Sequence, residues 1–157
     1  MKPSDYLAWL GPIYLVAVSW PLILADVRER RLPNKYTLPV FPIATLGQCL
    51  AVAGGQPLTK FLIALLCAVI AFAAGVALNR YAGLGMGDVK LIAGITLSLA
   101  WFSPLLPGIA LFIGLVIAGA VALFMVATRK TRMGSSIALG PYLLVGFVLS
   151  FIVQGWS

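Results

Sequence analysis

The sequence contains no histidine and only four acidic residues in 157. Without an imidazole group, Ser-His-Asp triads, Cys-His pairs and histidine-ligated zinc are all excluded. The two cysteines, Cys49 and Cys67, lie far apart within apolar stretches and are too few for a disulfide framework or a structural zinc site. We therefore predict no metal and no cofactor, and we expect any catalytic chemistry to depend on carboxyl groups.

Charged residues of both signs are scarce as well. They make up 10% of the chain, whereas hydrophobic residues make up 62%. An ordinary soluble domain has about 25% charged residues. A soluble fold of this length cannot bury so much apolar surface, so the excess must face lipid. We predict an all-α integral membrane protein with a single polytopic domain over residues 1–157.

Long uncharged stretches separate short clusters of charge and define the expected helices. A helix needs about 20 residues to cross the hydrocarbon core. The stretch 91–128 is too long for one crossing, and Pro104 and Pro107 divide it into two helices. In the second expected helix, Pro39 and Pro42 weaken the helical pattern. We predict a bundle of about six transmembrane helices, near residues 6–25, 38–54, 61–79, 89–103, 108–127 and 137–154.

Basic residues predict the orientation of this bundle. The expected loops 26–37, 80–90 and 128–136 hold nine of the eleven lysines and arginines, and the opposite side holds only Lys2 and Lys60. The positive-inside rule places these three loops in the cytoplasm and both termini outside. Because the net charge of +7 is divided among these membrane-border clusters, we expect membrane lipid as a partner and no nucleic acid.

Two aspartates fall at the expected cytoplasmic border of the membrane. Asp26 ends the first expected helix and Asp88 opens the fourth. Carboxylates at this depth are costly unless they are paired or solvated, so they point to function. Two carboxyl groups in hydrogen-bonding range share a proton, so one can activate water while the other polarises a peptide carbonyl. Interfacial anchoring of the aspartates by Arg28 or Lys90 is the alternative that the sequence leaves open.

The segments around both aspartates carry a family resemblance. Asp26 precedes a basic stretch that ends L-P-N at 32–34, and G-M-G-D-V-K-L occupies 85–91. With A-L-G-P-Y-L at 138–143, they resemble the GxGD aspartyl proteases of the type IV prepilin peptidase family. Larger members carry a cytoplasmic insert with paired Cys-x-x-Cys motifs and a methyltransferase activity. The short loop after Asp26 has no cysteine, so the chain is similar to the peptidase-only form.

This resemblance implies a membrane-embedded aspartic endopeptidase. Its expected substrates are prepilins or pseudopilins, from which it would remove a short basic leader peptide at the cytoplasmic face of the cell membrane. Asp26 and Asp88 match the two catalytic aspartates, and Gly85 and Gly87 match the motif glycines. Substrate binding or support of the motif is expected for the other matched residues, Pro33, Asn34, Lys90, Gly140 and Pro141.

The positions of the motif residues within the expected helices predict their roles. The positive end of the fourth helix favours a carboxylate at Asp88, and the negative end of the first favours a protonated acid at Asp26. On this basis Asp88 would be the base that activates water and Asp26 the acid. Gly140 and Pro141 fall inside the last expected helix and either kink it toward the site or are tolerated there.

Several other functions stay open on the sequence alone. An archaeal preflagellin-type peptidase shares the GxGD motif. A lipoprotein signal peptidase also uses two aspartates, but at the outer face and with fewer helices. A small ion-coupled transporter subunit would use the same aspartates as proton or cation sites, although no internal repeat accompanies them. An assembly subunit without chemistry is the remaining alternative.

The predicted orientation is tested by thiol labelling of intact cells. A cysteine placed in 128–136 should be protected from a membrane-impermeant thiol reagent, because the positive-inside rule puts this loop in the cytoplasm. A cysteine near Ser157 should be labelled and serves as the control. Labelling of the loop from outside would reverse the orientation.

Overall fold

The structure is a computed structural model that describes residues 3–29, 32–128 and 138–154. Within these ranges the chain is helical and contains no strand, as the sequence predicted. A short 3-10 helix, η1 (Pro3–Trp9), leads into the first long helix, and the four-residue α2 (Asn34–Thr37) precedes the second. The six long helices are α1 (Leu10–Glu29), α3 (Val40–Ala53), α4 (Leu58–Ala82), α5 (Met86–Ala100), α6 (Leu106–Ala127) and α7 (Gly140–Gln154).

Most of the long helices have the length and the exposed apolar faces of membrane-spanning helices, and α5 and α7 are shorter. α7 is apolar but shorter than a full crossing, and the 15 residues of α5 extend about 22 Å at 1.5 Å per residue. Large apolar side chains of α4 and α6 are exposed, which suits helices that face lipid. Among the described residues, four helical segments are long and apolar enough to span a bilayer, namely Asp5–Glu29, Asn34–Ala53, Leu58–Ala82 and Leu106–Ala127.

Several prolines mark the beginnings of helices in this fold, whereas Pro21 lies inside α1. Pro39 is the N-cap of α3, and Pro42 lies in its first turn, where a backbone N–H has no intrahelical partner to lose. The two prolines are therefore compatible with the second predicted helix. Pro104 lies in the turn between α5 and α6, and Pro107 is the second residue of α6, so the predicted division of 91–128 into two helices is confirmed.

The ends of two helices differ from the sequence-based prediction. α1 continues to Glu29, so Asp26 lies inside its last turn instead of at its end. α7 begins at Gly140, and Leu139 before it is not helical. The prediction that Gly140 and Pro141 lie inside the last helix, where they would either kink it or be tolerated, is therefore wrong. These residues open the helix, because a proline in the first turn costs no hydrogen bond.

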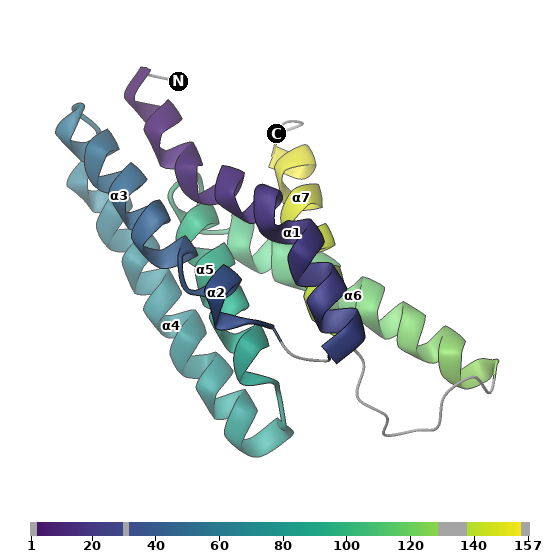
Figure 1. Ribbon diagram of the computed structural model, residues 1–157. Coiled ribbons are helices and arrows are strands. Elements are labelled where there is room, and N and C mark those ends of the chain that lie inside the picture. Colours follow the sequence, from purple (N-terminus) through teal and green to yellow (C-terminus); the bar gives the residue numbers. More distant parts are fainter. Residues whose placement is uncertain (1–2, 30–31, 129–137, 155–157) are drawn as a thin grey trace.

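α5 is the central helix of the bundle. Ten of its 15 residues are buried, and it contacts every other long helix. α4 packs mainly along α5, and α6 mainly along α7 (Figure 1). Small residues allow both close approaches. A Cβ atom on Gly75 of α4 would lie 2.8 Å from Val89 Cγ1, and one on Gly114 of α6 would lie 2.9 Å from the carbonyl oxygen of Tyr142.

The two ends of the bundle differ in chemical character. The end of α1, the turn between α4 and α5, and the start of α7 lie at one end, whereas α1 begins and α7 finishes at the other (Figure 1). At that second end, the rings of Trp9, Phe102 and Phe151 form a cluster with centroid distances of 4.8 to 5.9 Å. The three loops predicted to be cytoplasmic adjoin elements at the first of these two ends.

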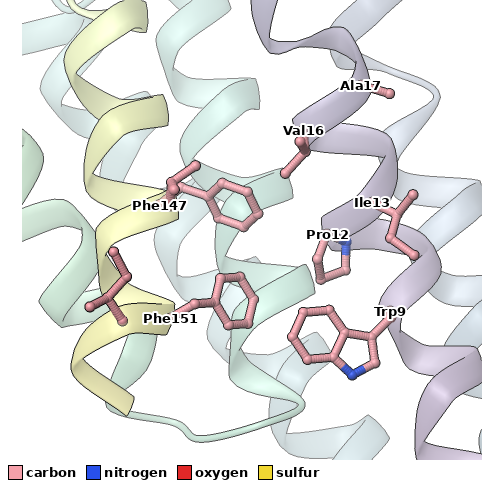
Figure 2. Close-up of a pocket in the computed structure, with 9 residues that line it drawn as sticks. Trp9, Pro12, Ile13, Val16, Ala17, Phe147 and Phe151 are labelled. Atoms are coloured by element: carbon pink, nitrogen blue, oxygen red, sulfur yellow. The ribbon is translucent and has the colours of Figure 1, made fainter. Parts of the chain in front are cut away.

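An apolar groove lies between α1 and α7 beside this aromatic cluster. Trp9 and Val16 face Phe147 and Phe151 across it (Figure 2), and Ile13 also lines it. The groove has a volume of about 520 Å³, and we call it the α1–α7 groove. It lies toward the beginning of α1, whereas Asp26 is in the last turn of that helix.

Candidate active site

Asp26 is buried in the last turn of α1 and joins that helix to the start of α7. Only 5% of its surface is exposed, and its Oδ2 accepts a 2.8 Å hydrogen bond from the backbone N–H of Gly140. Gly140 is the first residue of α7, where backbone N–H groups have no partner within the helix and the helix dipole is positive. The carboxyl group therefore satisfies one of these donors.

The glycine at position 140 makes this contact possible. A Cβ atom there would lie 2.6 Å from Asp26 Oδ2 and 3.2 Å from Leu32 Cδ2. Any side chain would therefore displace the carboxyl group from the N–H that holds it. Gly140 is needed for the close approach, and its backbone is the hydrogen-bond donor.

Asp88 lies in the first turn of α5, whose N-cap is Gly85. Its Oδ1 is buried and has no hydrogen-bond partner in the part of the chain that the structure describes. Its Oδ2 lies against Gly85, where a Cβ atom would approach to 2.9 Å. The motif glycine thus leaves the space that the Asp88 carboxyl group occupies.

Gly87 brings the segment after α1 against the start of α5. A Cβ atom on Gly87 would lie 2.8 Å from Leu32 Cβ and 3.3 Å from the Leu32 backbone nitrogen. Leu32 follows α1, whose last turn carries Asp26, and Gly87 directly precedes Asp88 in α5. Gly87 therefore permits the approach that places the two aspartates at one site.

Both aspartates line one cavity of about 360 Å³. The cavity combines polar and apolar surface, as a site for a peptide bond beside apolar chain would require. Its other lining residues are Leu32, Asn34, Gly85, Met86, Gly87 and Lys90.

Lys90 is held by Asn34 at this cavity. Its Nζ donates a 2.9 Å hydrogen bond to Asn34 Oδ1, which joins the start of α2 to α5. Neither Lys90 nor Arg28 forms an ion pair with an aspartate among the described residues. Within the described ranges, neither Arg28 nor Lys90 is thus the charge partner that interfacial anchoring by these two residues would require.

The other predicted motif residues lie around the cavity without lining it. Pro33 is the extended N-cap of α2 and directly precedes Asn34, which lines the cavity. Pro141 follows Gly140 in the first turn of α7. Leu32 and Met86 line the cavity but were not predicted, because no pattern distinguishes an apolar lining residue in so apolar a chain.

The described residues contain no group of three Cys, Asp or Glu side chains that could hold a metal ion. The chemistry available at this cavity is that of two carboxyl groups and a lysine ammonium group. The two carboxyl groups, one ionised and one protonated, can remove a proton from water and supply one to a carbonyl oxygen.

The sequence profile of the type IV leader peptidase family matches residues 13–124. This chain belongs to that family. The match includes Asp26 and Asp88 and ends before Gly140. Comparison with curated proteins and with solved structures gives no match. Membership identifies the protein as a peptidase and confirms the resemblance that the motifs indicated.

Replacing Gly140 with alanine tests the contact between α1 and α7. The added methyl group should displace the Asp26 carboxyl group and lower kcat for leader cleavage by about a hundredfold, since a shift of about 1 Å can cost that much. Gly108→Ala is the control, because nothing lies within 4 Å of a Cβ atom there. Unchanged cleavage by Gly140→Ala, with the protein still folded in detergent, would mean that this contact is not needed.

Proposed function

We propose that this leader peptidase is an aspartic endopeptidase that removes the short basic leader from prepilins or pseudopilins. The observation that carries the proposal is the single cavity lined by Asp26 and Asp88, brought together from α1 and α5. Family membership supports a prepilin-type protein as the substrate in general. The absence of Cys-x-x-Cys from the sequence supports the peptidase-only form.

The cell membrane is the proposed location, with the aspartates on the cytoplasmic side and both termini outside. The distribution of nine basic residues against two supports this orientation. In Figure 1, the end of α1, the turn between α4 and α5 and the start of α7 lie at one end of the bundle, and Asp26 belongs to the last turn of α1. A leader that stays in the cytoplasm would then reach the site without crossing the membrane.

The proposed reaction uses one carboxylate and one carboxylic acid. The carboxylate removes a proton from a water molecule, whose oxygen forms a bond to the scissile carbonyl carbon. The carboxylic acid donates its proton to the carbonyl oxygen as the tetrahedral intermediate forms. Return of that proton and transfer of the other to the amide nitrogen break the C–N bond and release the leader.

Within this pair, we assign the base to Asp26 and the acid to Asp88, the reverse of the assignment from the dipoles of their own helices. Asp26 accepts the Gly140 N–H at the positive end of α7, which favours the carboxylate. Asp88 Oδ1 is buried without a partner among the described residues, and ionisation of such a group is costly. The shared proton therefore resides on Asp88.

The aspartates are tested individually by isosteric substitution. Asp26→Asn and Asp88→Asn should each lower kcat for prepilin cleavage at least a hundredfold, because asparagine removes the proton chemistry and keeps the shape. Glu29→Gln is the matched control, since Glu29 is an exposed acidic residue of the same helix. Near-normal cleavage by either aspartate variant would overturn the two-carboxyl mechanism. A preflagellin included in the assay identifies that alternative substrate.

The position of the shared proton is tested by infrared spectroscopy with isotope-labelled aspartate and the two single Asn variants. A protonated carboxyl band should disappear in Asp88→Asn and persist in Asp26→Asn. A pH–rate profile is not the measurement of choice, because a coupled pair titrates as a unit. Loss of the band only in Asp26→Asn would restore the assignment from the helix dipoles.

A further inference from the structure

The proposed reaction moves a negative charge from one aspartate to the other. Asp26 starts as the carboxylate and becomes neutral when it takes a proton from water, whose oxygen bonds to the scissile carbonyl carbon. Asp88 starts as the acid and becomes a carboxylate when its proton passes to the carbonyl oxygen. The total charge is unchanged, but in the tetrahedral intermediate the negative charge lies on α5 instead of α1.

The surroundings of Asp88 offer this new carboxylate little stabilisation through hydrogen bonds. Asp88 Oδ1 is buried and has no hydrogen-bond partner in the part of the chain that the structure describes. A buried carboxylate without a hydrogen bond or a charge partner is costly. A cation close to Asp88 would therefore lower the energy of the tetrahedral intermediate relative to the starting state.

Lys90 brings a positive charge to the cavity that the two aspartates line. Of the described residues that line this cavity, Lys90 is the basic one. It follows Asp88 by two residues on α5. Its side chain is partly buried, so solvent screens its charge less than the charge of a fully exposed lysine.

The hydrogen-bond partner of Lys90 leaves that charge uncancelled. Lys90 Nζ donates a 2.9 Å hydrogen bond to Asn34 Oδ1, which belongs to a neutral amide, and no ion pair joins Lys90 to a carboxylate within the described ranges. Asn34 is the first residue of α2, and α2 is fastened to α1 by a 3.0 Å hydrogen bond from the Tyr14 hydroxyl group to the carbonyl oxygen of Tyr36. Asn34 therefore fixes the ammonium group and leaves its charge available to the cavity.

We propose that the ammonium group of Lys90, held in place by Asn34, stabilises the carboxylate that forms on Asp88 in the tetrahedral intermediate. This inference rests on the proposed peptidase function. Lys90 shares α5 with Asp88, whereas the hydrogen bond from Gly140 keeps the Asp26 carboxyl group against the start of α7. The charge of Lys90 therefore favours movement of the negative charge toward α5, and it acts through space without direct contact.

Two substitutions remove the proposed charge by different routes. Lys90→Met deletes the ammonium group and keeps an unbranched side chain, and Asn34→Asp replaces the neutral amide beside Lys90 Nζ with a carboxylate. Each should lower kcat for prepilin cleavage about tenfold with KM little changed, because the stabilised charge forms only as the reaction proceeds. Lys90→Arg keeps the charge and should retain most of kcat.

Lys35→Met is the matched control. Lys35 is an exposed lysine that directly follows Asn34 and does not line the cavity, so its loss makes the same change in net charge and should leave both constants unchanged. All variants are compared at equal amounts of folded protein, measured by circular dichroism in detergent. Equal losses of kcat in Lys35→Met and Lys90→Met, or in Lys90→Arg and Lys90→Met, would overturn the proposal.

A second substrate separates this role from the binding of an acidic side chain of the substrate. In a prepilin whose acidic residues beside the scissile bond are changed to amides, Lys90→Met should lose the same fraction of kcat as it does with the unaltered prepilin. A loss confined to the acidic substrate, or a rise in KM in place of the fall in kcat, would assign Lys90 to substrate binding and contradict the proposal.

Failure of this role and failure of the proposed function give different results. No cleavage of any prepilin or pseudopilin by the wild type, or near-normal cleavage by Asp88→Asn, contradicts the proposed function itself. Normal wild-type cleavage, with Asp88→Asn inactive and kcat unchanged in Lys90→Met, overturns the role of Lys90 and leaves the peptidase function standing.

Discussion

The hydrogen bond between the Gly140 N–H and Asp26 is the interaction on which the site depends. It gives a buried carboxyl group a donor in a bundle that offers few polar partners, and it fixes the end of α1 against the start of α7. Without it, Asp26 would be buried without a partner, which is costly in apolar surroundings. The geometry of the cavity follows from this contact together with the approach of Leu32 to Gly87.

Three motif glycines act through the space that they leave empty. Gly140 makes room for Asp26, Gly85 for Asp88, and Gly87 for Leu32. In each case the neighbour belongs to this chain, and two of the three neighbours are the aspartates themselves. The motif glycines therefore allow α1, α5 and α7 to approach one another closely, in addition to forming a sequence signature.

Long apolar runs and basic loops were sufficient to predict the six helices and the common end at which Asp26 and Asp88 lie. The scarcity of acidic residues made the two aspartates stand out. The sequence could not reveal the donor for Asp26, because Gly140 is 114 residues away and no local pattern links them. The same lack of a local pattern explains why the role assignment from the helix dipoles was reversed. That assignment took account of the end of α1 but not of the start of α7. Leu32 and Met86 were missed because apolar lining residues resemble every other apolar residue here.

The separation of Asp26 and Gly140 along the chain also affects when their contact can form during synthesis. Both aspartates emerge from the ribosome before α7 does, and at about 5–20 residues per second the 114 residues between Asp26 and Gly140 take about 6 to 23 s. During that interval Asp26 has no α7 to hold it. The hydrogen bond that holds the Asp26 carboxyl group can therefore form only after α7 has been synthesised.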